Sequence, residues 1–109
     1  MNDLVNRLSS GEHPVEISLR PERSVAAFRA CLERGYVLVK FTDTRGGTEL
    51  GVRLDPELTE LSTASFSMGH GTVRLVGVLT LDYVPVRCVA EINVEALAGT
   101  GHLESIQDN

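Results

Sequence analysis

The amino-acid sequence predicts an α+β fold: an antiparallel sheet of four to five strands with one main helix, about residues 21–34, packed on one face. Two patterns favour this class. Apolar residues recur at helical spacing over 21–34, and after Gly35 they alternate with polar residues at the two-residue period of strands. The order, a strand, a helix and then four strands in meander-like pairs, is typical of an antiparallel sheet with a helix laid on it.

The residues at its two ends bound the predicted helix. Pro21 suits the first helical position, where its missing N–H costs nothing, and Gly35 suits the C-terminal end, where many helices stop at a left-handed residue. The apolar side chains of the helix share about one third of its circumference; they are Val25, Phe28, Cys31 and Leu32. A helix with a single apolar stripe covers one face of a sheet.

Period-two alternation and turn residues together define the strands. The segments predicted to be extended are 15–19, 36–43, 48–55, about 72–82 and about 86–94. Gly46 and Gly47 supply the positive φ of a tight hairpin turn, and Pro85 marks another turn because proline cannot donate to a ladder.

We expect one domain, residues 1–109, with loosely held ends over 1–13 and 100–109. The first segment contains a short helical pattern, and the residues after 95 begin with a helical turn and then fray. No targeting segment and no long apolar run is visible, so a cytoplasmic protein without a membrane anchor is expected.

Composition narrows the classes of function. The chain has a net charge of −5, which argues against a nucleic-acid binder, since such proteins usually carry a basic surface. Its two cysteines, Cys31 and Cys88, are expected to be free buried thiols, and no spacing of ligand residues indicates a metal or a cofactor. Neither a phosphate-binding loop nor a nucleophile motif is present.

Alternation divides the predicted sheet into two faces. The first is apolar throughout and is predicted to form the core beneath the helix; it comprises Val37, Val39, Phe41, Leu50, Val52, Leu54, Val73, Leu75, Leu79, Leu81, Val86, Cys88, Ala90, Ile92 and Val94. The second face is less polar than a purely solvated surface should be, because it carries Leu38, Val76, Val78 and Val89. One helix cannot cover both faces, so this second face is predicted to be an interface.

The predicted interface consists of an apolar group with a basic rim: Leu38, Val76, Val78 and Val89, with Arg53, Arg74 and Arg87. A symmetric homodimer is the simplest way to cover it. A different hypothesis joins Lys40 and the three arginines into one anion-binding patch. The acidic residues on the same face, Glu49 and Glu91, argue against that patch.

The stretch "SFSMGHGTV" raises the possibility of a site. His70 could act as a catalytic or ligand-binding group, with Phe66 and Met68 forming an apolar wall. Its candidate hydrogen-bond acceptors are Asp43, Glu60, Asp82 and Glu91. The flanking glycines are explained by a turn that enters the strand at about residue 72, which is the preferred interpretation. His13 and His102 are expected in a turn and in the frayed tail, where no precise geometry is held.

The leading functional hypothesis is a non-catalytic interaction protein, homodimeric through the second face, that acts as an accessory or assembly subunit for a larger partner. The alternative is a small cofactor-free enzyme or ligand-binding domain with its pocket at residues 62–72 and His70 as the polar group.

Overall fold

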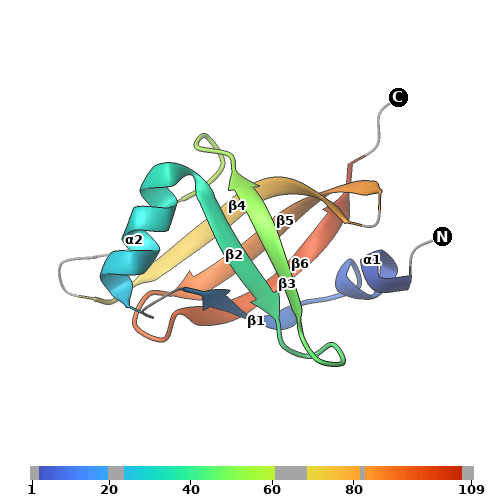
Figure 1. Ribbon diagram of the computed structural model, residues 1–109, viewed down its shortest axis with the longest axis horizontal. Coiled ribbons are helices and arrows are strands. Elements are labelled where there is room, and N and C mark those ends of the chain that lie inside the picture. Colours follow the sequence, from blue (N-terminus) through green and yellow to red (C-terminus); the bar gives the residue numbers. More distant parts are fainter. Residues whose placement is uncertain (1–2, 20–23, 61–68, 82, 107–109) are drawn as a thin grey trace.

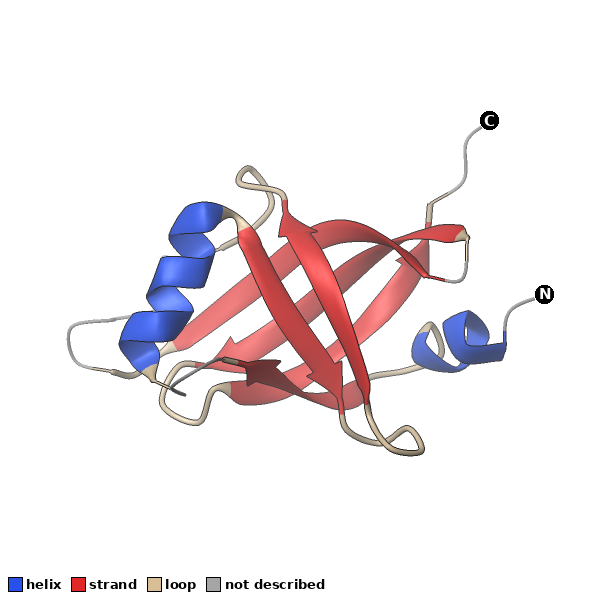
Figure 2. Cartoon of the chain, in the orientation of Figure 1, coloured by secondary structure: helices blue, strands red, loops and turns tan. Residues whose placement is uncertain are grey.

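The computed structural model is a closed antiparallel β-barrel of six strands with a helix near each end (Figures 1 and 2). It describes residues 3–19, 24–60, 69–81 and 83–106. The elements in chain order are α1 (Asp3–Leu8), β1 (His13–Ser18), α2 (Val25–Arg34), β2 (Tyr36–Phe41), β3 (Thr48–Leu54), β4 (Thr72–Leu81), β5 (Val84–Asn93) and β6 (Ala98–Ser105). Each strand pairs with the next one, and β6 pairs with β1 to close the barrel.

The predicted α+β sheet of four to five strands with a helix on one face is therefore wrong, as is the α+β class itself. The main cause is β6, which lies where the sequence analysis expected a helical turn and a loose tail. This strand pairs along its whole length with β5, and its first residues pair with β1 from His13↔Gly101 to Glu16↔Ala98. Because the last strand pairs with the first, the sheet closes on itself. One of its faces is the interior of the barrel, and the other is the outer wall.

Two glycines explain why β6 is hard to see in the sequence. A Cβ atom at Gly99 would fall on the carbonyl oxygen of Glu91, and one at Gly101 would lie 2.9 Å from the Cβ of Ala90. Strand β6 thus runs so close to β5 that these positions exclude side chains. Glycine has low intrinsic strand propensity and often marks a tight bend or a close backbone approach. The residues that permit closure are therefore the ones that weaken the strand pattern.

The two helices cover opposite ends of the barrel (Figure 1). The side chain of Phe28 in α2 is fully buried, and Val5 and Leu8 of α1 are buried as well. Helix α2 begins after Ser24, whose hydroxyl accepts a hydrogen bond from the N–H of Ala27 at 3.1 Å. The predicted start at Pro21 falls outside the described residues. Within the described ranges, neither helix is long and apolar enough to span a membrane.

The core that the sequence predicted for one sheet face is the interior of the barrel. Thirteen of its fifteen members are buried, and Leu79 and Leu81 are partly buried and pack against the core. The barrel and its ends together bury Val5, Leu8, Val15, Ile17, Phe28, Leu97 and Leu103 in the same cluster. Barrels of eight strands are only just wide enough to be filled by side chains, and six strands enclose less. The interior is a packed core.

We predict that Gly99→Ala lowers the free energy of unfolding by about 1–3 kcal/mol, because a methyl group must displace the β5 backbone. A loss of that size lowers the melting temperature by several degrees in a domain of about 100 residues. The matched control is Thr100→Ala, because Thr100 is the exposed neighbour on the same strand. Thermal unfolding followed by circular dichroism measures both variants. Equal melting temperatures for the two would contradict the close-approach argument.

Candidate functional site

The pairing between β3 and β4 is the shortest in the barrel. Only Arg53↔Val78 and Leu54↔Gly77 are in register, whereas β4 and β5 pair over their full length. Toward the β2–β3 hairpin the two strands diverge, as Figure 2 shows. Here Gly51 of β3 and Thr80 of β4 face each other without ladder pairing. We call this unpaired stretch between β3 and β4 the seam.

Gly77 explains why the strands meet at one end of the seam. A Cβ atom there would lie 2.5 Å from a methyl carbon of Val52 and would also strike the carbonyl oxygen of Arg53. Glycine therefore lets the β3 backbone cross directly over β4. Beyond Leu54 the chain continues alongside β4. The N–H of Asp55 donates a hydrogen bond to the carbonyl oxygen of Val76, with an N···O distance of 2.7 Å. The contact is tight at this end and open at the other.

The direction of the β3 backbone shows which groups face the seam. The N–H of Leu54 donates to the carbonyl of Gly35 at 2.8 Å on the β2 side, and the N–H of Asp55 points to β4. Since successive residues of a strand present their N–H and C=O groups to alternate sides, Arg53 and Gly51 also point toward β4. The main-chain groups of Gly51 are thus directed into the seam.

A cleft of about 420 Å³ lies over the seam on the outer wall. Its lining residues come from four strands and the segment after β6: Tyr36, Gly51, Arg53, Val78, Leu79, Thr80, Pro85 and Ile106. The ring of Tyr36 lies across Gly51, so closely that a Cβ atom on Gly51 would overlap the phenol oxygen. Tyr36 and Val78 are among the most exposed large apolar side chains described, at 48% and 44%. We call this feature the seam cleft.

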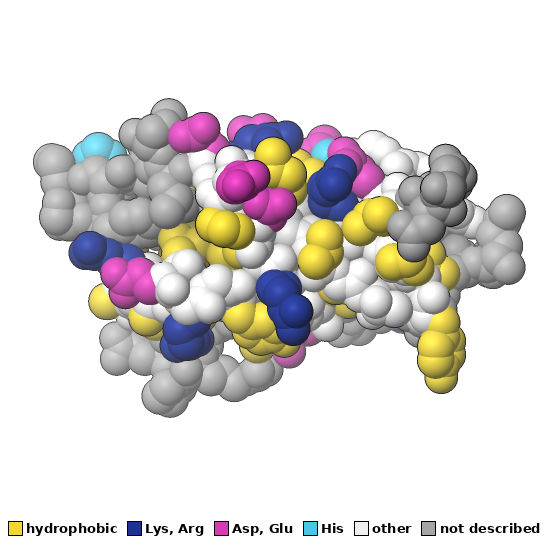
Figure 3. Space-filling view, turned by 90° about the horizontal axis from the view of Figure 1, so that it is seen from above, with side chains coloured by type: hydrophobic (Ala, Val, Ile, Leu, Met, Phe, Trp, Pro, Cys, Tyr) yellow, Lys and Arg dark blue, Asp and Glu magenta, His cyan; other side chains and the backbone are white. Residues whose placement is uncertain are grey.

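Arg53 occupies the centre of this surface. It also lines a cavity of about 470 Å³ near the C-terminal end of α2 and a third of about 390 Å³ beside the turn that follows β3. Asp55 and Glu57 share the third cavity with it. Within the described chain, however, no carboxylate forms an ion pair with Arg53. Figure 3 views the molecule from above and shows hydrophobic side chains among basic and acidic ones, several of which adjoin each other.

The structure divides the predicted interface residues into two groups. Arg53, Val78 and Arg87 follow one another in register across the outer wall. Val76 and Val89 are also neighbours, but both are buried within the chain, at 2% and 8% exposure. The hydroxyl of Thr59 bonds both main-chain groups of Val76, and Glu60 pairs with Arg74, so the segment after β3 runs alongside this part of β4. Alternation identified the outward direction of Val76 and Val89 but could not reveal what covers them.

The remaining predicted interface residues lie on other parts of the wall. Leu38 is half-buried and pairs with Gly51. Arg74 is exposed, with Glu91 beside it on β5 and its main chain bonded to Glu60. Lys40 lies between Glu16 and Glu49 on the neighbouring strands. Three of the four basic residues of the anion-patch hypothesis therefore have acidic residues beside them on adjacent strands, and only Arg53 and Arg87 flank the same residue, Val78.

The imidazole of His70 is exposed and makes no hydrogen bond or ion pair with another described residue. It lies between Gly69 and Gly71, whose φ angles are 69° and 102°. Phe66 and Met68, the proposed walls of its pocket, fall outside the described residues, and none of the cavities given above is lined by His70. The pocket hypothesis therefore receives no geometry from the structure.

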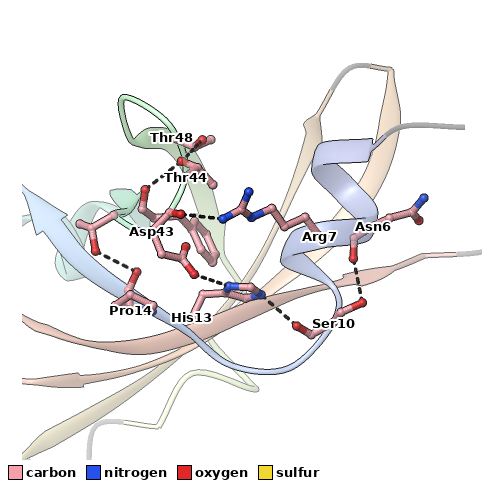
Figure 4. A network of polar contacts seen from close by, with 10 residues as sticks. Asn6, Arg7, Ser10, His13, Pro14, Asp43, Thr44 and Thr48 are labelled. Carbon is pink, nitrogen blue, oxygen red and sulfur yellow. Dashed lines mark hydrogen bonds and ion pairs between the residues drawn. The ribbon is translucent and has the colours of Figure 1, made fainter.

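His13, by contrast, is held by a network that sequence analysis did not foresee (Figure 4). Its Nδ1 lies 2.7 Å from the Oδ2 of Asp43, and its Nε2 lies 3.0 Å from the carbonyl oxygen of Ser10. Arg7 donates to the carbonyl of Asp43 at 2.8 Å, and the ring packs edge-on against Phe41. The network joins α1 and β1 to the turn after β2.

The His13 network is built to hold a charged imidazole. The hydrogen bond to the Asp43 carboxylate raises the pKa of His13 above its ordinary value of 6.5, although burial opposes the shift. With acceptors on both ring nitrogens, the protonated form can donate on both sides. A general base needs a free nitrogen near its substrate. Because both nitrogens are engaged, we interpret the network as a structural clamp. Only the three-dimensional pairing of the β1 start with the β2–β3 turn could have revealed it.

The other reactive groups in the described chain are also engaged or shielded. His102 lies on β6, with Nδ1 against Glu12 and Nε2 3.0 Å from Glu104. Burial raises the pKa of Cys88 to about 12, so its thiol stays protonated and poorly nucleophilic. Cys31 is half-buried beside Arg34. Among the described residues, no group of three or more histidine, cysteine or acidic side chains could hold a metal ion.

The clamp predicts a pH-dependent contribution to stability. Because the folded-state pKa of His13 is raised, its contribution is complete below the unfolded value near 6.5 and is lost as the pH rises through the folded value. Asp43→Asn should cost about 1 kcal/mol near pH 5.5 and less near pH 8.5, a modest figure because Asp43 is one-third exposed. Urea unfolding at both pH values measures this difference. Glu95→Gln, at an exposed turn position, is the control. A cost that is independent of pH would refute the clamp.

No protein-family model matches this chain. No curated protein matches it either. Its function must therefore be inferred from the surface and the chemistry of its own residues.

Proposed function

We propose that this chain is a non-catalytic protein-interaction module that binds its partner through the seam cleft. The observation that carries the proposal is Arg53, an exposed cation between the exposed side chains of Tyr36 and Val78, without an ion pair in the described structure. Tyrosine and arginine are enriched among residues that dominate binding energy at protein interfaces. An exposed apolar surface around such residues supports a role in binding.

The interior of the barrel supports the same proposal, because buried apolar side chains occupy it. The side chains that point inward are apolar and nearly all buried, including Leu75, Ile92 and Leu103, each no more than 1% exposed. Small-molecule sites require a concave space with a few convergent polar groups. The apolar lining of this core provides no such groups, which favours the outer wall as the binding surface.

The state of the histidines and of Cys88 supports a non-catalytic role. His13 hydrogen-bonds through both ring nitrogens, His102 lies between Glu12 and Glu104, and Cys88 is buried, whereas the exposed His70 lines none of the cavities described above. Catalytic groups are usually poised in a cleft next to a space for substrate. The seam cleft is lined instead by one arginine, one tyrosine, one threonine, one glycine and four apolar residues.

The partner is either a second copy of the chain or a larger protein. A standard interface buries about 800 Å² on each partner, which is about one eighth of the 6515 Å² exposed by this chain. Because Val76 and Val89 are already buried, a symmetric dimer has less apolar wall to use than the sequence suggested. A cytoplasmic location is part of the proposal and fits the two free cysteines.

The proposal predicts a position-specific contact in cells. A photo-crosslinking amino acid at Val78, which is 44% exposed, should give a discrete adduct of higher mass after irradiation. The same substitution at Glu95, an exposed position on the turn between β5 and β6, should give none. An adduct of twice the chain mass identifies self-association, and any other discrete mass identifies a larger partner. Equal or absent adducts at both positions would refute the proposal.

Val78→Asp provides the complementary test. An exposed substitution away from caps and buried groups usually changes stability by less than about 0.5 kcal/mol. Circular dichroism should therefore show an intact fold, while the adduct from a crosslinker at the neighbouring Thr80 should disappear. Persistence of that adduct with a folded Val78→Asp variant would place the contact elsewhere.

A further inference from the structure

We propose that the seam is an acceptor for one extended strand of a partner protein, and that an acidic side chain of this strand pairs with Arg53. This inference rests on the proposed function and specifies the chemistry of the partner. It follows from three observations on the outer wall: unpaired main-chain groups, a cleft beside them, and a cation that has no acidic neighbour on either adjacent strand.

The first observation is the unpaired edge. In a closed barrel the main-chain groups of every strand normally form hydrogen bonds with two neighbouring strands. This leaves no free edge that could bind another strand. Strand β3 departs from this rule, because its ladder with β4 ends at Arg53 and leaves Gly51 directed into the seam. Thr80 of β4 faces it in the same way. Exposed strand edges bind extended peptides through main-chain hydrogen bonds, and neighbouring side chains give specificity.

The second observation is the shape of the seam cleft. Its 420 Å³ volume is bordered by both unpaired strands, so a guest main chain would meet Gly51 or Thr80 on entry. A strand rises about 3.3 Å per residue, and the free stretch therefore pairs with only about three guest residues. Tyr36 and Val78 border this stretch. They offer apolar contacts to guest side chains that point outward.

The third observation is the electrostatic setting of Arg53. Four basic residues project from the barrel strands, and three of them have an acidic residue beside them on an adjacent strand. These neighbours are Glu16 and Glu49 for Lys40, Glu91 for Arg74, and Glu104 for Arg87. Arg53 is flanked by Tyr36 and Val78. In a chain with a net charge of −5, a basic residue without such a neighbour fits a negative group supplied by a partner.

An acidic strand is favoured over a second copy of the chain. Two copies could pair their β3 strands around Gly51, but each β3 already has β2 on one side and β4 close to its C-terminal end. Two whole barrels would then have to approach within the spacing of paired strands, about 4.8 Å. A single extended segment meets no such obstacle. Self-association therefore stands as an alternative that the experiment distinguishes.

The test uses two short blocked peptides and the full chain. Both alternate valine and threonine; one carries a central glutamate and the other a lysine. Backbone amide signals are followed by heteronuclear NMR while each peptide is added. The glutamate peptide should shift the amides of Gly51 and Thr80 and slow their hydrogen exchange, as expected for a new ladder. The lysine peptide should bind about fivefold more weakly, the scale of one exposed ion pair.

Variants assign the charge preference to Arg53. Arg53→Gln should remove the difference between the two peptides, and Arg53→Glu should reverse it. Arg74→Glu, at an exposed position of the adjacent strand, is the matched control and should preserve the preference for glutamate. If Arg53→Glu does not fold, the Gln variant and the hydrogen-exchange readout decide alone.

Each outcome separates this inference from the proposed function. If neither peptide shifts the seam amides while the Val78 crosslink persists, the cleft binds a folded surface and the strand inference is overturned. If the Val78 adduct has twice the chain mass and light scattering shows a dimer, the occupant is a second copy and the inference again falls. If the peptides bind without any preference for glutamate, the role of Arg53 is refuted.

Discussion

The close approach of β6 to β5 is the constraint on which the rest of the structure depends. Gly99 and Gly101 leave no room for side chains, and this lets β6 continue around the barrel to reach β1. Without that final pairing the six strands would form an open sheet with two long edges. Closure turns one face into a single apolar core and leaves the other as a curved outer wall. The close approach of main chains, with the hydrogen-bonded ladders that it permits, thus sets the architecture.

Closure is not uniform around the barrel, and the candidate site lies where it is least complete. Gly77 permits a tight crossing of β3 over β4 at one end, and the strands separate toward the other. A strand pair that crosses so closely must diverge, because each strand also follows its other neighbour. The seam is therefore a consequence of the same glycine-dependent packing that closes the barrel. Tyr36, which lies over Gly51, covers the outer side of this strand.

The sequence predicts local structure here better than it predicts assembly. Alternation placed the inward side chains of β2 to β5 correctly, because a two-residue period reports directly which way each side chain points. It missed β6, where Gly99 and Gly101 are required by the close approach of the β5 backbone, which the alternation pattern does not report. It therefore also missed the pairing that closes the barrel. It also placed Val76 with an exposed group, although Val76 is buried, since a strand pattern does not encode the chain segment that Thr59 anchors beside it. His13 was missed for a similar reason, because Asp43 is 30 residues away in the chain.

The distribution of charge links the fold to the proposed binding. Arg53 has no acidic residue beside it on β2 or β4, where Tyr36 and Val78 flank it, although Asp55 and Glu57 of its own segment line a neighbouring cavity. Lys40, Arg74 and Arg87 each have an acidic residue on an adjacent strand, and such cross-strand pairs favour strand pairing. Arg53 instead lies next to an unpaired stretch of strand, with main-chain donors and acceptors on one side and a positive charge on the other. Those two features together select an extended acidic segment over a folded neutral surface, because only such a segment satisfies both at once.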